Sequence, residues 1–181
     1  MKYLIGVTGS VAAYKAVSIV RGLLKVHPTN EVKVIMTESA KKFITPLSLQ
    51  LACKDQVYDD ELWWSKVDVL HIELANWCDK FVVVPATANT IAKLSNGIAD
   101  NFLTATALAL NNNVNKYIIP SMNTNMLHNH NTQHNISNLK LFSDYKVIEP
   151  DEGMLACGVE GEGKLPKTKD IIDRLIGDYV L

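Results

Sequence analysis

The chain has 181 residues, of which 48% are hydrophobic, and a formal net charge of −1 at pH 7. These values are typical of one globular domain with a sizeable core, and they exclude a strongly charged surface for nucleic acid or an anionic membrane. No apolar run approaches the length of a membrane span, and the apolar start at Met1–Val7 is too short for a secretory signal. The three cysteines, Cys53, Cys78 and Cys157, are widely spaced. We therefore expect a cytoplasmic protein with neither a disulfide framework nor a metal site.

Apolar runs alternate with segments of helical periodicity along the whole chain. Strands are expected at Tyr3–Val7, Val32–Met36, Lys80–Pro85, Asn115–Pro120 and Lys146–Ile148. Helices are expected at Val11–Lys25, Ser39–Phe43, Pro46–Ala52, Thr90–Leu94, Asn101–Leu110, Gln133–Leu141 and Lys169–Ile176. Several strands are apolar throughout, which is typical of a parallel sheet covered on both faces. The pattern predicts a single α/β domain over residues 1–181, a doubly wound parallel sheet in a Rossmann-like or flavodoxin-like three-layer sandwich.

Small and hydroxyl-bearing residues follow the first two expected strands, where such folds bind ligands. Gly6–Ser10 leads directly into a helix, and free amides at a helix start can hold an anion. The segment has neither the spacing of a dinucleotide fingerprint nor the lysine of a phosphate-binding loop, so Gly9 and Ser10 suit a single phosphate. Thr37 and Ser39 offer two more hydroxyls at the next helix start. In both places the alternative is that the hydroxyls only cap the helix.

Three polar loops with almost no charge lie at or near the next strand ends. They are Pro85–Thr90, Ala99–Asn101 (which carries one aspartate) and Pro120–Met126. A neutral, hydrogen-bonding heterocycle such as an isoalloxazine ring needs such a lining, with Met122 and Phe43 as apolar walls. Ordinary turn chemistry is the alternative, since Asn and Thr favour turns.

Two residues with reactive side chains stand out. His71 precedes the third expected strand, where it could face the same crevice, and its ordinary pKa suits proton transfer. Cys157 lies in the glycine-rich segment Gly153–Pro166, which reads either as a mobile lid over a substrate or as a surface loop with a buried, inert thiol. The remaining histidines and two nearby carboxylates are expected to be solvated surface groups: His27, His128, His130, His134, Glu160 and Glu162.

Together these motifs closely resemble the homo-oligomeric flavin-containing cysteine decarboxylases. The matching segments span nearly the whole chain in the family's order: Gly9–Lys15, Thr37–Phe43, the His71 segment, Pro85–Thr90 with Ala99–Asn101, Pro120–Met126 and the cysteine segment. Ala156-Cys157-Gly158 is similar to the lid of the branch that decarboxylates phosphopantothenoylcysteine in coenzyme A synthesis, and lantibiotic peptidyl-cysteine decarboxylases lack it. Two positions depart from the family pattern, Leu127 in place of an aromatic residue and Lys164 in place of an arginine.

The resemblance implies an FMN enzyme that oxidises the substrate's cysteine thiol to a thioaldehyde, releases CO2 and reduces the resulting enethiol, giving 4′-phosphopantetheine. Asn123 would bind the departing carboxylate, His71 would act near the thiol and flavin, and Cys157 would donate the proton for enethiol reduction. The implied cofactor-binding residues are Gly9, Ser10, Thr37, Ser39, Phe43, Thr87, Asn89, Ser121 and Met122, with Ser10 and Ser39 at the phosphate.

The same resemblance implies a homotrimer, or a dodecamer of trimers, with FMN at subunit contacts. It also implies a separate synthetase that supplies the small-molecule substrate, and no nucleic-acid or membrane partner. Three alternatives remain at this point. They are a peptidyl-cysteine decarboxylase that stops at the enethiol, a flavin-modifying prenyltransferase of similar fold, and a non-catalytic flavin-binding regulatory subunit.

Overall fold

A six-stranded parallel sheet forms the centre of the computed structural model, which describes residues 1–65 and 69–177. Its spatial order is β3-β2-β1-β4-β5-β6. The strands are β1 (Lys2–Val7), β2 (Glu31–Met36), β3 (Val57–Tyr58), β4 (Lys80–Ala86), β5 (Asn115–Pro120) and β6 (Tyr145–Val147). Without the two-residue β3, the longer strands follow the doubly wound order of flavodoxin-like folds, second, first, third, fourth, fifth. The predicted fold class is therefore confirmed.

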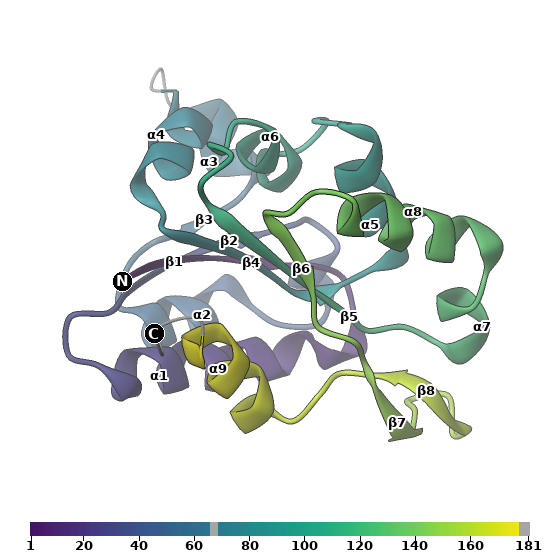
Figure 1. Cartoon of the computed structure of the whole chain (residues 1–181). Helices are drawn as coiled ribbons and strands as arrows, with labels where there is room; N and C mark the ends of the chain where they lie inside the picture. The colour runs from purple at the N-terminus through teal and green to yellow at the C-terminus, as the bar shows by residue number, and fades with distance from the viewer. Residues whose placement is uncertain (66–68, 178–181) are drawn as a thin grey trace.

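Helices cover both faces of this sheet (Figure 1). One face carries α1 (Lys15–Val26), α2 (Pro46–Cys53) and α9 (Thr168–Ile176). The other carries α3 (Asp60–Ser65), α4 (Leu70–Trp77), α5 (Ala88–Asn96), α6 (Phe102–Leu108) and α8 (His130–Lys140). Short helical turns at η1 (Val11–Tyr14), η2 (Ala40–Lys42) and α7 (Thr124–Leu127) follow β1, β2 and β5. No helix in the described ranges combines the length and the apolar character needed to cross a bilayer.

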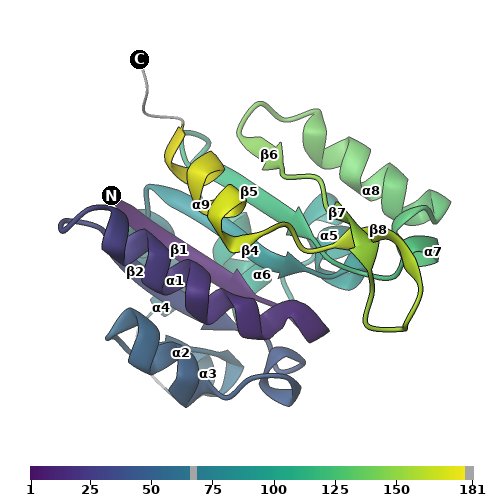
Figure 2. The ribbon, with the colours of Figure 1, turned by 90° about the horizontal axis from the view of Figure 1, so that it is seen from below.

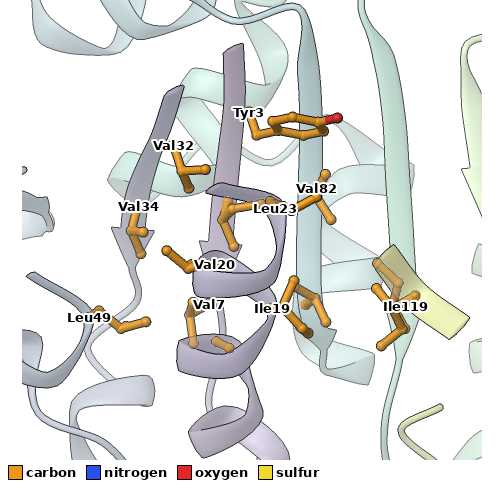
Figure 3. Packing of buried hydrophobic residues seen from close by; sticks show 14 of the residues in the cluster. Tyr3, Val7, Ile19, Val20, Leu23, Val32, Val34, Leu49, Val82 and Ile119 are labelled. Carbon is orange, nitrogen blue, oxygen red and sulfur yellow. The ribbon is translucent and has the colours of Figure 1, made fainter. Parts of the chain in front are cut away.

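The core on the α1 face explains why this helix forms where it does. Ile19, Val20 and Leu23 recur at helical spacing on one side of α1, and none of them is exposed to solvent. They pack on strand residues such as Val34 of β2 and Val82 of β4, which Figure 3 shows on either side of the helix. Burying such side chains contributes roughly 1.5–3 kcal/mol each, which fixes α1 and hence the loop that precedes it.

A separate antiparallel hairpin lies beyond the sheet. It consists of β7 (Asp151–Met154) and β8 (Glu160–Lys164). Figures 1 and 2 both show it next to α7, at the end of the sheet where β5 finishes. This hairpin was not expected as a pair of strands, and it occupies most of the predicted cysteine lid.

Other differences from the expected elements are local. The expected helix Val11–Lys25 is divided, because its first four residues form the 3-10 turn η1 and only Lys15–Val26 is α-helical. Ser39–Phe43 likewise contains only the 3-10 turn η2. The elements β3, α3 and α4 were not expected at all.

Candidate active site

The neighbouring strands β1 and β4 are joined by hydrogen bonds at their carboxyl ends. From β1 the chain adds strands toward one edge of the sheet, and from β4 it adds them toward the other edge. Thr8, which is 1% exposed, donates its hydroxyl to the carbonyl of Pro85 at 2.6 Å and accepts the N–H of Thr87 at 3.1 Å. The N–H of Ser121 donates to the carbonyl of Ala86 at 3.1 Å, which adds the end of β5. The loops after three neighbouring strands are therefore held side by side, at the position where doubly wound folds bind ligands.

The loops after β1 and β2 touch each other. A Cβ added to Gly9 would lie 2.5 Å from the Cβ of Ser39, so only glycine allows this approach. Ser39 is exposed, and its side chain makes no cap hydrogen bond to η2. The hydroxyl of Ser10, in contrast, accepts the N–H of Ala12 at 3.3 Å. Gly9 and Ser39 therefore lie in contact, and the capping alternative is correct for Ser10.

The other residues predicted to bind the cofactor differ in whether their side chains are free. Thr87 caps α5, accepting the N–H of Thr90 at 3.3 Å and donating to its hydroxyl at 3.2 Å. Asn89 is exposed, and Phe43 is 48% exposed. Thr37 hydrogen-bonds the carbonyl of Val7 through its backbone N–H, at 3.0 Å. The Thr87 side chain is thus used to cap α5, while the side chains of Asn89 and Phe43 are exposed.

The hairpin is held on the loop after β5 mainly by backbone contacts. Met122 donates its N–H to the carbonyl of Gly163 at 3.0 Å, and the hydroxyl of Thr124 donates to the carbonyl of Glu162 at 2.7 Å. A Cβ on Gly163 would lie 2.0 Å from the Met122 carbonyl oxygen, and one on Gly161 would lie 2.5 Å from the Thr124 hydroxyl. The glycines of β8 therefore allow the hairpin to sit directly on this loop.

A contact between the His128 and Glu162 side chains reinforces that attachment. The Nε2 of His128 lies 2.9 Å from a carboxylate oxygen of Glu162, and both side chains are about half exposed. Both groups are exposed at the surface, as expected, but their contact was not expected. His128 follows α7 and Glu162 lies in β8, and these segments are brought together only by the fold.

Cys157 lies at the tip of the hairpin and is exposed, so the alternative of a buried, inert thiol is wrong. Asn123 donates its side-chain amide to the Cys157 sulfur at 3.5 Å. The pKa of Cys157 is lowered, first by a hydrogen bond from the Val159 backbone and then by the Asn123 amide. Burial instead raises the pKa of Cys53 and raises that of Cys78 to about 12. Among the three cysteines, Cys157 thus combines an exposed thiol with a lowered pKa.

A cavity of about 620 Å³ separates the hairpin from the start of α1. Its lining includes five of the predicted site residues: Ser10, Ser121, Met122, Asn123 and Cys157. It also includes residues that sequence reasoning did not assign to the site: Val11, Ala12, Tyr14, Lys15, Met154, Leu155, Ala156, Gly163, Lys164 and Leu165. Lys15 could have been noticed, because it ends the Gly9–Lys15 motif. The apolar hairpin residues carried no such signal.

His71 does not join this cavity. It lies on α4 with its ring edge-on to Trp63, at 5.5 Å between ring centroids. Its Nδ1 is buried and has no hydrogen-bond partner among the described residues. Figures 1 and 2 both place α4 well away from the hairpin. Within one chain, His71 is therefore not brought to Asn123 and Cys157.

The loops at this edge of the sheet suit a flavin mononucleotide in their chemistry. The loops after β1, β2, β4 and β5 present hydroxyls, amides and one thioether at residues such as Ser39, Asn89 and Met122. Neutral donors of this kind match the polar edge of an isoalloxazine ring, and the hydroxyls with the η1 amides match one phosphate. No carboxylate lines the cavity within the described part of the chain.

Comparisons with known proteins agree with this chemistry. The Flavoprotein family model matches residues 1–179. The probable phosphopantothenoylcysteine decarboxylase of Streptococcus mutans is 45% identical over 175 residues, covering 96% of each chain. The coenzyme A biosynthesis bifunctional protein of Bacillus subtilis is 43% identical over 93% of this chain, which spans only 41% of that longer protein.

Solved structures show the same relationship. A PPC decarboxylase mutant complexed with pantothenoylaminoethenethiol superimposes with a TM-score of 0.89 at 31% identity, covering 98% of this chain and 97% of that one. The FMN binding protein AtHal3 superimposes with a TM-score of 0.86 at 32% identity, covering 98% and 96%. With its fold, its exposed cysteine and a match over residues 1–179, the chain belongs to the Flavoprotein family.

Proposed function

We propose that the protein is a phosphopantothenoylcysteine decarboxylase, which uses FMN to convert 4′-phosphopantothenoylcysteine to 4′-phosphopantetheine in coenzyme A biosynthesis. The observation that carries this proposal is the exposed Cys157 thiol, held by the Asn123 amide at the mouth of the cavity. The decarboxylases similar to this chain over nearly its full length support the same activity. When bound, FMN would accept two electrons from the substrate thiol and later return them, and the thioaldehyde formed in between would take up the electron pair that remains when CO2 leaves.

The cofactor would be held by the residues named from the sequence. Ser10 and Ser39 bind its phosphate beside Gly9, where the loops after β1 and β2 meet. Thr37 and Phe43 flank that position, and the ring edge is bound by the loops after β4 and β5, through Thr87, Asn89, Ser121 and Met122. Phe43 and Asn89 have exposed side chains, which leaves them available for these contacts.

Asn123 binds the substrate carboxylate. Its Oδ1 accepts the N–H of Asn125 at 2.9 Å, which fixes the orientation of the amide. One amide hydrogen is directed to the Cys157 sulfur, and the second is available to the carboxylate. A neutral donor suits this step, because the negative charge of the carboxylate passes to the substrate sulfur while CO2 leaves uncharged.

Cys157 donates a proton when the enethiol is reduced. A thiol with a lowered pKa is a stronger acid than an ordinary cysteine, which favours proton transfer from Cys157 to the substrate. The hairpin also covers the cavity with Met154, Leu155 and Ala156, which limits the access of water to a reactive intermediate.

His71 acts in thiol oxidation, and we propose that it reaches the site from a second copy of the chain in a homotrimer or a dodecamer of trimers. Its buried Nδ1 without a partner and its distance in the fold from the cavity support this arrangement. Trp64, 76% exposed beside Trp63, offers apolar surface for such a contact. Residues 1–181 would act as one cytoplasmic domain, with a separate synthetase producing the substrate that bifunctional relatives make within one chain.

The proposal is tested with purified protein and phosphopantothenoylcysteine. We expect yellow protein with bound FMN, release of CO2, and a product with the mass of 4′-phosphopantetheine. A colourless protein that does not take up FMN would contradict the cofactor assignment. A product that remains at the enethiol level would contradict the reaction, and would instead match a peptidyl-cysteine type of decarboxylase.

A further inference from the structure

The ring of His71 is oriented by aromatic packing. His71 lies in the first turn of α4, and Trp63 of α3 meets its ring edge-on, with 5.5 Å between the ring centroids. Trp63 in turn stacks on Phe102, at 5.7 Å and an interplanar angle of 20°. The Nδ1 of His71 has no hydrogen-bond partner among the described residues, so the ring lacks the carboxylate or carbonyl contact that usually orients a catalytic histidine. Its orientation therefore depends on the packing against Trp63.

Trp63 is itself fixed, because α3 holds Phe102 in two ways. Asp60 accepts the backbone N–H of Phe102 at 2.6 Å, while Trp63 stacks on the ring of this fully buried residue. Asp60 and Trp63 are three residues apart and therefore lie on the same side of α3. Asp59, just before α3, pairs with Lys41 at 2.7 Å, which joins α3 to the loop after β2. The aromatic wall beside His71 is thus anchored at two separate points.

The two ring nitrogens of His71 have different surroundings. Nδ1 is buried by the chain's own atoms, so a neighbouring copy cannot supply a hydrogen-bond acceptor to it, whereas Nε2 is not enclosed in this way. A neutral imidazole carries a single proton. A buried N–H without an acceptor is rarer in folded proteins than an acceptor without a donor, because the unmade bond of the donor is costly. The neutral ring therefore has its proton on Nε2 and its lone pair on Nδ1.

We propose that Trp63 is the positioning residue of His71, and that His71 donates a hydrogen bond from Nε2 to the substrate sulfur instead of accepting its proton. This inference rests on the proposed function. With its proton on Nε2, the ring presents a donor to the substrate, and its lone pair is enclosed by the protein. The S–H proton then passes to water and the electron pair stays on sulfur, where the Nε2–H stabilises the thiolate before its oxidation.

Two substitutions of His71 distinguish a hydrogen-bond donor from a base. The amide nitrogen of a glutamine can replace Nε2–H, whereas that of an asparagine lies closer to the position of Nδ1, and neither amide is a base. The measurement is the anaerobic reduction of bound FMN by saturating phosphopantothenoylcysteine, followed as loss of the yellow colour. His71→Gln should react about 10- to 100-fold faster than His71→Asn, the value of one hydrogen bond to a charged group. Equal rates in the two variants would overturn the donor role.

Substitutions of Trp63 test the positioning. Trp63→Leu should slow the reduction of FMN by about 10- to 100-fold, as for a small misplacement of a catalytic group, while the protein stays yellow and assembles like wild type. Trp63→Phe keeps an aromatic ring and should recover most of the rate. The control Trp77→Leu removes an indole from the last residue of the same helix, where it contacts Lys33 at 4.9 Å, and should react like wild type. If Trp77→Leu is as slow as Trp63→Leu, Trp63 only supports the helix and the positioning role is overturned.

A spectroscopic measurement tests the proton position without substrate. In FMN-loaded protein labelled with 15N-histidine, the His71 signals are identified by their loss in His71→Gln. Under conditions where the ring is neutral they should show a protonated Nε2 and an unprotonated Nδ1. Trp63→Leu should lose this single pattern, and Trp77→Leu should keep it. A proton on Nδ1 would make Nε2 a free base and overturn the inference. Failure of the wild-type protein to oxidise the substrate would instead remove the proposed function, and the nitrogen signals separate these two failures.

Discussion

The side-chain amide of Asn123 reaches the sulfur of Cys157 across 3.5 Å, although 34 residues separate the two positions in the sequence. Asn123 begins the short helix after β5, and Cys157 lies at the tip of a hairpin outside the sheet. One residue thus contacts the proton donor and is also free to bind a carboxylate. The two half-reactions of the proposed function are consequently joined at Asn123.

Replacing the thiol should separate these half-reactions. We expect Cys157→Ser to release CO2 but to stop before the final reduction, because a serine hydroxyl is a far weaker acid than a thiol. Mass spectrometry should then find a product lighter than 4′-phosphopantetheine by two hydrogens. Cys53→Ala is the control, since that thiol is buried at the last residue of α2 and lies outside the cavity. Wild-type product from Cys157→Ser would show that the thiol is not the donor.

Changing the amide to a carboxylate should affect both substrate and thiol. We expect Asn123→Asp to keep FMN and lose turnover, because the new charge repels the substrate carboxylate. The pKa of Cys157 should rise, since a hydrogen-bond donor that stabilises the thiolate is replaced by a negative charge. Alkylation by iodoacetamide, followed against pH, should therefore have its midpoint at a higher pH than in wild type. An unchanged midpoint would show that the Asn123 contact does not influence the thiol.

Two hairpin glycines provide a matched pair of substitutions. Gly163 has φ +119°, and a Cβ there would strike the Met122 carbonyl, while Gly158 has φ +79° with nothing within 4 Å. Both alanine variants have unfavourable backbone angles, but only Gly163→Ala must also move the hairpin. We expect that variant to lose about 100-fold in kcat/KM, as for a small misplacement of catalytic groups.

Thermal unfolding should identify the origin of this loss. The hairpin lies outside the central sheet, so the Tm of both alanine variants should fall by similar, small amounts. If Gly158→Ala is as inactive as Gly163→Ala, the loss comes from the backbone angle and not from the contact with Met122.

Mixed assemblies can show whether the site is shared between copies. His71→Asn and Asn123→Asp should each be folded, yellow and inactive. If the two residues of one site come from different copies, co-assembly at equal amounts should restore about one quarter of wild-type activity. Each site then needs an intact His71 from one copy and an intact Asn123 from its neighbour, and each of these is present in half of the copies. Mixing the separately assembled variants without subunit exchange is the control. No recovery in verified hybrids would place both residues of a site in the same chain.

The sequence was informative about the sheet because its strands are buried on both faces. β1, β4 and β5 are nearly continuous apolar runs, so their positions and the doubly wound order could be expected. The short strand Val57–Tyr58 has too few residues to show a period. The hairpin strands are largely exposed and rich in glycine and charge, so they lack the alternation that identifies a half-buried strand.

The candidate site was predictable wherever it follows the ends of those strands. Ser10, Ser121, Met122 and Asn123 do meet in one cavity. The position of His71 was not predictable, because the helix α4 that carries it was not recognised and packs on the opposite face. Contacts between segments distant in sequence, such as those of Lys15 with the end of β8, follow only from the folded arrangement.

Different groups of the hairpin attach it to the domain and line the cavity. Backbone groups at Gly163 and Glu162 hold it in place, whereas the side chains of Met154, Leu155 and Ala156 face the cavity. Those three side chains can therefore be exchanged without releasing the tip that carries Cys157. In this fold the choice of what enters the cavity is open to redesign, or to evolutionary change, while the position of the thiol stays fixed.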